Sequence, residues 1–152
     1  MNTVVQVRPA QRCRVAPGAL ALLESARQGL IGAASETGAG ARYVAAHLAA
    51  LRAAAAIVAA RSAPGSGPRR RSQPRSVWEL LPRVEPALAE WAAFFAAGAG
   101  KRAAAEAGLL RAVSAREADD LLRDAETFVS LAEQALGMAS PGQTPLPLRT
   151  AG

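Results

Sequence analysis

An arginine and a histidine five residues apart, Arg42 and His47, are the residues of this chain best suited by type and spacing to chemistry. His47 is the only histidine. An imidazole can move the proton of a ribose 2′-hydroxyl or of a leaving group, and a guanidinium can stabilise the negative charge of a phosphorane. Together they can cleave RNA without a metal ion. We therefore treat Arg42 and His47 as the candidate catalytic residues of a metal-independent endoribonuclease.

A packing role for His47 is the alternative interpretation. Residues five apart on a regular helix are separated by about 140° around the helix axis. The two side chains therefore converge only if Arg42 lies in a frayed first turn or if a second subunit contributes one of them. Otherwise we expect His47 to be a partly buried, neutral imidazole beside Tyr43 and Ala50. Whether the protein is an enzyme stays open at this point.

A basic segment provides a second candidate site, for nucleic acid, made of Arg69, Arg70, Arg71 and Arg75. These side chains could track phosphates, and the formal net charge of +6 suits an anionic partner such as RNA or an acidic protein. Their proline and serine neighbours make a solvated linker an equally good interpretation. RNA and another protein are therefore both candidate partners.

Nothing in the sequence predicts a metal ion or a cofactor. Zinc-ligand spacing, a phosphate-binding glycine loop and a nucleophile elbow are all missing from the sequence. Four acidic residues near the start of the last expected helix are better explained by the helix dipole and a solvated face. They are Glu117, Asp119, Asp120 and Asp124.

Apolar periodicity predicts an all-α fold, an antiparallel up-and-down bundle of four to five helices. Aromatic residues make up only 4% of the chain, which favours close-packed helices over a β-sandwich. A helix that starts near Pro17 places four apolar residues on one side: Leu23, Ala26, Leu30 and Ala33. A second helix, from about Ala41 to Arg61, is expected to face the core with Val44, Leu48, Leu51, Ala55 and Val58.

Two capping boxes mark helix starts in the second half of the chain. Ser76 with Glu79 predicts one start, after which Pro82 and Pro86 interrupt the helix before a longer segment that ends near Ala97. The expected core residues of this region are Val84, Leu88, Trp91 and Phe95, and core packing is also expected for Trp78 and Phe94. A bend follows at Gly98–Gly100. Ser114 with Glu117 predicts the last helix, whose stripe is Ala118, Leu121, Ala125, Phe128, Ala132 and Ala135.

The chain is expected to form one helical domain over residues 17–137, with a flexible basic loop at 62–75. Residues 1–16 and 138–152 have the composition of disordered ends. The single cysteine, Cys13, gives no internal disulfide and fits a reducing cytoplasm. The longest apolar run, Ala53 to Ala60, is far shorter than the ~20 residues that span a bilayer, so we expect a cytoplasmic protein with no membrane partner.

Four segments carry a family resemblance: residues 42–52 (RYVAAHLAALR), 75–82 (RSVWELLP), 90–95 (EWAAFF) and 115–122 (AREADDLL). Together they resemble a HEPN-domain family (higher eukaryotes and prokaryotes nucleotide-binding) of high-GC Gram-positive bacteria, over about residues 19–137. The resemblance implies an up-and-down helical bundle, often dimeric. Its superfamily includes metal-independent ribonucleases of toxin–antitoxin and defence systems beside many members that look non-catalytic.

Active members of that superfamily carry an arginine, four to six residues and then a histidine, near the start of a late helix. Arg42 and His47 match the spacing but belong to an early helix. The resemblance therefore implies a homodimeric HEPN-like module that binds nucleic acid or a partner, with ribonuclease activity as one possibility. The alternative is a non-catalytic structural, dimerisation or protein-interaction module.

Overall fold

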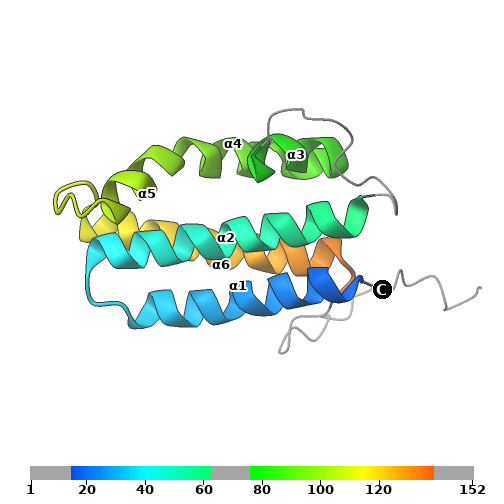
Figure 1. Cartoon of the computed structure of the whole chain (residues 1–152), viewed down its shortest axis with the longest axis horizontal. Coiled ribbons are helices and arrows are strands. Elements are labelled where there is room, and N and C mark those ends of the chain that lie inside the picture. The colour runs from blue at the N-terminus through cyan, green and yellow to red at the C-terminus, as the bar shows by residue number, and fades with distance from the viewer. Residues whose placement is uncertain (1–14, 63–75, 139–152) are drawn as a thin grey trace, which may run out of the picture.

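Helices form the framework of residues 15–62 and 76–138, the part of the chain that the computed structural model describes (Figure 1). In chain order they are α1 (Pro17–Ser35), α2 (Ala39–Arg61), α3 (Val77–Val84), the 3-10 turn η2 (Pro86–Leu88), α4 (Ala89–Ala97), α5 (Ala99–Glu106) and α6 (Ala115–Ala135). These two described ranges contain no strand. The predicted all-α fold is confirmed.

Several sequence predictions fall on parts of the chain outside the described residues. They concern residues 1–14 of the N-terminal arm, residues 63–75 of the basic loop and residues 139–152 of the C-terminal tail. Cys13 and the four arginines proposed for nucleic acid, Arg69, Arg70, Arg71 and Arg75, belong to these segments. They stay sequence-based predictions.

Four arms run alternately up and down, with α2 near the centre (Figure 1). The first arm is α1, the second is α2, and α3, η2, α4 and α5 follow one another as a broken third arm before α6 returns along the bundle. Helix α2 contacts α1, α3, α5 and α6. The residues on α2 are therefore the ones that the rest of the fold surrounds.

Prolines and a glycine divide the third arm. Pro82 lies inside α3 and Pro86 begins η2, and neither can donate a backbone hydrogen bond. Glu85, between α3 and η2, has a non-helical backbone conformation with φ −144° and ψ 82°. Gly98 then separates α4 from α5, as the sequence predicted for this bend.

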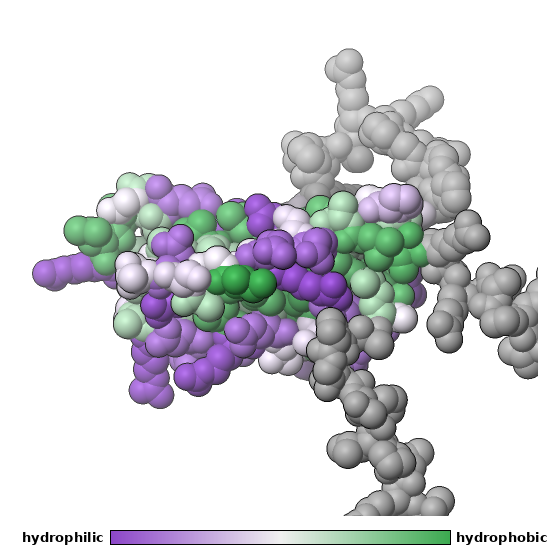
Figure 2. Space-filling model, turned by 90° about the horizontal axis from the view of Figure 1, so that it is seen from below, coloured by the Kyte–Doolittle hydropathy of each residue, from purple (hydrophilic) through white to green (hydrophobic). Residues whose placement is uncertain are grey.

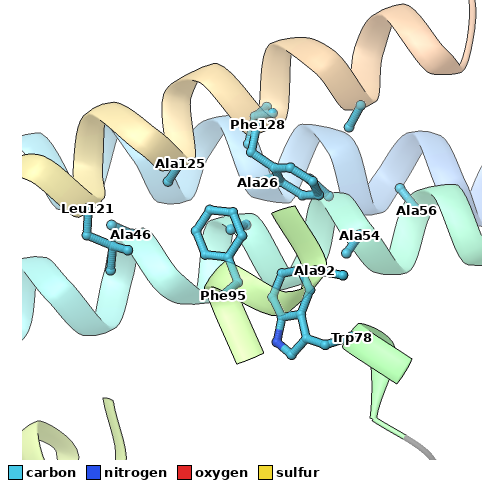
Figure 3. Packing of buried hydrophobic residues seen from close by; sticks show 14 of the residues in the cluster. Ala26, Ala46, Ala54, Ala56, Trp78, Ala92, Phe95, Leu121, Ala125 and Phe128 are labelled. Carbon is cyan, nitrogen blue, oxygen red and sulfur yellow. The ribbon is translucent and has the colours of Figure 1, made fainter. Parts of the chain in front are cut away.

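The core is built from alanines of α2 and a group of aromatic rings (Figure 3). Phe95 is the central ring: its centroid lies 5.2 Å from that of Trp78, in a stacked pair, and 5.2 Å from that of Phe128. Fully buried alanines of α2 let the neighbouring helices approach closely; they are Ala46, Ala49, Ala50, Ala53, Ala54 and Ala56. Large rings on α3, α4 and α6 fill the space beside this small-residue surface.

The predicted core stripe of α2 lies at the edge of the core: its Leu51 and Val58 pack against buried residues, but a different side of the helix is the most buried one. The members of the stripe, Val44, Leu48, Leu51, Ala55 and Val58, are only partly buried. The buried residues of α2 are instead Tyr43, Ala46, His47, Ala49, Ala50, Ala53, Ala54, Ala56 and Ile57. Because four other helices contact α2, it buries a wide arc of its surface, and a single 3.6-residue stripe does not describe such a helix.

The capping predictions met different outcomes. Ser114 and Glu117 form the predicted box: Ser114 Oγ accepts from the Glu117 amide at 3.1 Å, and Glu117 Oε2 accepts from the Ser114 amide at 2.8 Å. Ser76 is the N-cap of α3, but its side chain makes no capping hydrogen bond. Helix α3 therefore starts where the sequence predicted, without the predicted box.

The core prediction for the aromatic region holds for only some of its residues. Leu88, Phe95 and Trp78 are buried. Trp91 and Val84 are half-buried. The prediction is wrong for the phenylalanine next to Phe95. Phe94 points its ring outward, and 46% of its surface is exposed.

Helix α2 is also the one described helix that is long and apolar enough to cross a bilayer by length and composition. Half of its most apolar window is buried inside the bundle. Its apolar composition is accounted for by the helices that surround it.

Candidate functional site around His47

His47 lies on the inner side of α2, and none of its surface is exposed. Tyr43, one turn earlier on the same helix, stacks near it with ring centroids 6.4 Å apart. Trp78 and Phe95 present edges to it at 6.0 Å each. Three aromatic rings therefore border the buried imidazole.

Both ring nitrogens of His47 have partners. Nε2 lies 2.8 Å from the carbonyl oxygen of Phe95, and Nδ1 lies 3.1 Å from Nη1 of Arg102. A guanidinium can only donate hydrogen bonds, so Nδ1 must accept one from Arg102. Nε2 then carries the hydrogen and donates it to the Phe95 carbonyl. The contacts therefore assign one neutral tautomer to His47.

The surroundings of His47 favour this neutral form. Burial lowers the pKa of the imidazole below its ordinary value, and the positive charge of Arg102 lowers it further. The hydrogen bond to the Phe95 carbonyl and the charge of Glu106 act in the opposite direction. Protonation at Nδ1 would also set an N–H group against the N–H of Arg102. A second proton, on Nδ1, is thus disfavoured by burial, by the charge of Arg102 and by hydrogen-bond geometry.

Arg42 is directed to a different part of the fold. Its Nε and Nη2 donate to the backbone carbonyl of Glu36 at 3.2 and 2.7 Å. Its Nη1 forms an ion pair with the carboxylate of Asp119 on α6. Arg42 therefore ties the turn between α1 and α2 to the first turns of α6. The partners of His47 are on α4 and α5, so the structure does not bring Arg42 and His47 together within one chain.

The arginine that meets His47 is Arg102, which the sequence did not single out. It lies on α5, and its Nε is 3.6 Å from Oε1 of Glu106, one turn later. The same Nε is buried and makes no hydrogen bond. Arg102 and His47 are 55 residues apart in the sequence. No local pattern signals this contact, because it depends on the bend that sets α5 against α2.

Gly98 makes the close approach of these elements possible. A β-carbon at this position would lie 2.8 Å from the hydroxyl oxygen of Tyr43 and 3.4 Å from Cδ2 of His47. Burial raises the pKa of the Tyr43 hydroxyl, which stays protonated, 3.5 Å from the Gly98 carbonyl oxygen. The site is thus a packed junction between α2 and the α4–α5 bend.

Surface ion pairs border this junction. Nζ of Lys101 on α5 lies 2.6 Å from Oε1 of Glu117, the residue that also caps α6. No group of three or more metal-binding side chains is gathered anywhere in residues 15–62 and 76–138. The arrangement joins helices and fixes one histidine tautomer, and it leaves none of the surface of His47 exposed.

The comparison with protein families identifies the chain. A family model described as SAV_6107-like HEPN matches residues 33–133. No curated protein and no solved structure matches the chain. The match runs from the last turn of α1 to the last turn of α6. It therefore includes the junction between α2 and the α4–α5 bend. The chain therefore belongs to the HEPN family.

Proposed function

We propose that this HEPN domain is a non-catalytic module that acts by binding another protein. The observation that carries the proposal is the state of His47, the only histidine of the chain, whose surface is fully buried and whose two nitrogens are both engaged. A general base must come within about 2.6–3.2 Å of the proton that it removes. His47 would have to leave the core to do so.

The contacts of Arg42 support the same proposal. Its guanidinium is occupied by Asp119 and by the Glu36 carbonyl. A catalytic pair would have to exchange these contacts and those of His47 for contacts to RNA. Both side chains are therefore better explained as links between helices.

Exposed apolar side chains favour a protein as the partner. Leu109 and Leu110 follow each other in the turn between α5 and α6, and they are 61% and 96% exposed. Figure 2 shows hydrophobic surface at the end of the molecule that carries this turn. Contiguous exposed apolar surface is one of the features that mark protein interaction sites.

The proposal includes the cytoplasmic location and the homodimer expected from the sequence. A homodimer would sediment with twice the 15.6 kDa mass of one chain. RNA binding through Arg69, Arg70, Arg71 and Arg75 is the second candidate function. Its support is the net charge of +6.

RNA cleavage and RNA binding, measured on the full chain, test the proposal. We expect no cleavage by the wild type with or without EDTA, and the same result for His47→Gln. Cleavage that survives EDTA and falls about 10²- to 10⁴-fold in His47→Gln would restore the catalytic role. For binding, affinity that decreases steeply with salt supports phosphate contacts and the RNA alternative. Absence of RNA binding at low salt supports the protein-binding module.

A further inference from the structure

A small pocket between α4 and α6 combines two aromatic rings with two carboxylates. Its lining residues are Glu90, Trp91 and Phe94 on α4 and Asp124 on α6. Its volume is about 330 Å³. This volume is at the small end of the range for ligand pockets, about 300–1,000 Å³, so the pocket suits a single small chemical group. It is separate from the junction around His47.

The two rings of this acidic–aromatic pocket have different support. Trp91 packs inward against Phe95 and Phe128, with centroid distances of 5.9 Å to each. Phe94 stands nearly perpendicular to Trp91, at 6.2 Å and 87°, and is 46% exposed. The core thus fixes the indole, whereas the exposure of Phe94 has no explanation in core packing. Aromatic faces attract organic cations within about 6 Å of the ring centre.

The two carboxylates of the pocket are not engaged in ion pairs in the described part of the chain. Neither Glu90 nor Asp124 forms an ion pair with a basic side chain of residues 15–62 or 76–138. Burial and the neighbouring Asp120 raise the pKa of Asp124, and the charge of Arg123 partly offsets this. The Asp124 carboxylate is therefore partly desolvated beside a like charge. A bound cation would relieve this unfavourable situation.

We propose that the acidic–aromatic pocket binds a guanidinium or alkylammonium group. The rings supply cation–π contacts, and Glu90 and Asp124 supply the opposite charge. Such a group is carried by an arginine or lysine side chain of a protein or by a small organic amine. If the group belongs to a protein, this inference rests on the proposed function, because the protein partner of the module then carries the arginine or lysine that enters the pocket. The chain itself has a net charge of +6, so this attraction is local to the pocket.

Titration with defined probes tests the pocket. The probes are agmatine, the peptide acetyl-Ala-Arg-Ala-amide and the same peptide with citrulline, which is neutral, in place of arginine. The chain has two tryptophans, so ¹H–¹⁵N spectra report two indole N–H signals, which Trp91→Phe assigns. We expect agmatine and the arginine peptide to shift the signal of Trp91 and leave that of the buried Trp78 in place. The citrulline peptide should shift neither.

Variants separate the pocket from general surface charge. We expect Glu90→Gln with Asp124→Asn to weaken agmatine binding by about tenfold or more, and Phe94→Ala to weaken it severalfold. Glu126→Gln is the matched control for Asp124→Asn alone, because each removes one negative charge from α6 and only Asp124 lines the pocket. Circular dichroism of each variant checks that the helices are intact.

Three results would overturn parts of the inference. No shift of Trp91 with up to ~10 mM agmatine would exclude the cation site, since that concentration detects even millimolar affinity. An equal loss of binding in Asp124→Asn and Glu126→Gln would show diffuse surface charge instead of a pocket. Binding of agmatine without the arginine peptide would leave a small amine as the ligand and remove the link to a protein partner. RNA cleavage by the wild type would contradict the proposed function while leaving the cation site unaffected.

Discussion

At the scale of single residues, His47 illustrates how burial changes the role of a titratable group. Its spacing from Arg42 suggests acid–base chemistry, but its contacts place it between the Phe95 carbonyl and Arg102. These contacts satisfy two ring nitrogens that would otherwise be buried without a hydrogen bond, because none of the surface of His47 is exposed. Unsatisfied buried polar groups cost about 1–3 kcal/mol each. His47 is thus a link between α2 and the α4–α5 bend.

The lowered pKa of His47 predicts how stability depends on pH. In the range between the folded pKa and the ordinary value of 6.5, the unfolded chain binds a proton at His47 and the folded chain does not. The contribution of His47 to the free energy of unfolding is therefore complete above pH 6.5 and decreases as pH falls toward the folded pKa. The slope is at most about 1.4 kcal/mol per pH unit.

Urea unfolding of the wild type and of His47→Gln at pH 5.5, 6.5 and 7.5 measures this contribution. The carboxylates are the same in both proteins, so the difference between the two slopes reports on His47. We expect the wild type to lose stability more steeply than His47→Gln below pH 6.5. Parallel slopes would mean that the histidine titrates alike in the folded and unfolded chains.

At the scale of elements, the bend between α4 and α5 depends on Gly98. Its backbone angles, φ −81° and ψ −9°, are open to any residue, so the requirement for glycine is one of space. Because a β-carbon would lie 2.8 Å from the Tyr43 hydroxyl, Gly98→Ala must displace a buried side chain. We expect it to lower the free energy of unfolding by about 1–3 kcal/mol, measured by urea denaturation.

Two further variants distinguish this steric cost from a general effect of alanine. Gly100, two residues later in α5, has nothing within 4 Å of a β-carbon, so Gly100→Ala should be neutral or stabilising by about 0.5–1 kcal/mol. Tyr43→Phe removes the hydroxyl that obstructs the methyl group. It should therefore reduce the cost of Gly98→Ala. An unchanged cost in the double variant would argue against the contact with Tyr43.

The elements differ in how well the sequence predicts them. The start of α6 is predictable because Ser114 and Glu117 have the three-residue spacing of a capping box. The α4–α5 bend is predictable because Gly98 interrupts the helical pattern. The buried side of α2 is not predictable from one stripe, since helices contact it on several sides. The exposure of Phe94 is not predictable from the sequence either. Phe94 neighbours the buried Phe95, and only the placement of α6 decides which of the two rings faces solvent.

The contacts of the candidate site are harder to predict from the sequence than the fold is. His47 could be singled out because it is the sole histidine, but its partner Arg102 lies 55 residues away in another helix. The same is true of Arg42, whose ion pair with Asp119 spans 77 residues. Such contacts are set by how the helices pack. A spacing of five residues within one helix carries no information about them.

At the scale of the whole molecule, one ion pair joins the first and last helices. Nε of Arg27 on α1 lies 2.7 Å from Oε1 of Glu133 on α6, and Glu133 is buried, with 4% of its surface exposed. Arg27→Ala would remove this ion pair and its hydrogen bond from a buried carboxylate. We expect a loss of about 1–3 kcal/mol, below the full cost of breaking a buried pair because Arg27 is partly exposed.

Arg123→Ala provides the comparison for this whole-molecule prediction. In the wild type, the guanidinium of Arg123 lies 3.9 Å from the Asp120 carboxylate, and the Arg123 side chain is 77% exposed. An exposed pair of this kind contributes at most about 1 kcal/mol. Thermal melting should therefore show a clearly lower midpoint for Arg27→Ala than for Arg123→Ala. Equal midpoints would mean that the link between α1 and α6 does not stabilise the bundle.

The protonation state of His47, measured by NMR, tests most directly the claim that this histidine is a structural link and not a catalytic base. With one histidine in the chain, the imidazole ¹⁵N signals need no separate assignment. The account predicts a neutral ring with hydrogen on Nε2 at neutral pH, a pKa below 6.5, and an increase of that pKa in Arg102→Met, because a neighbouring positive charge is removed. A pKa at or above 6.5, with hydrogen exchanging between both nitrogens, would contradict it.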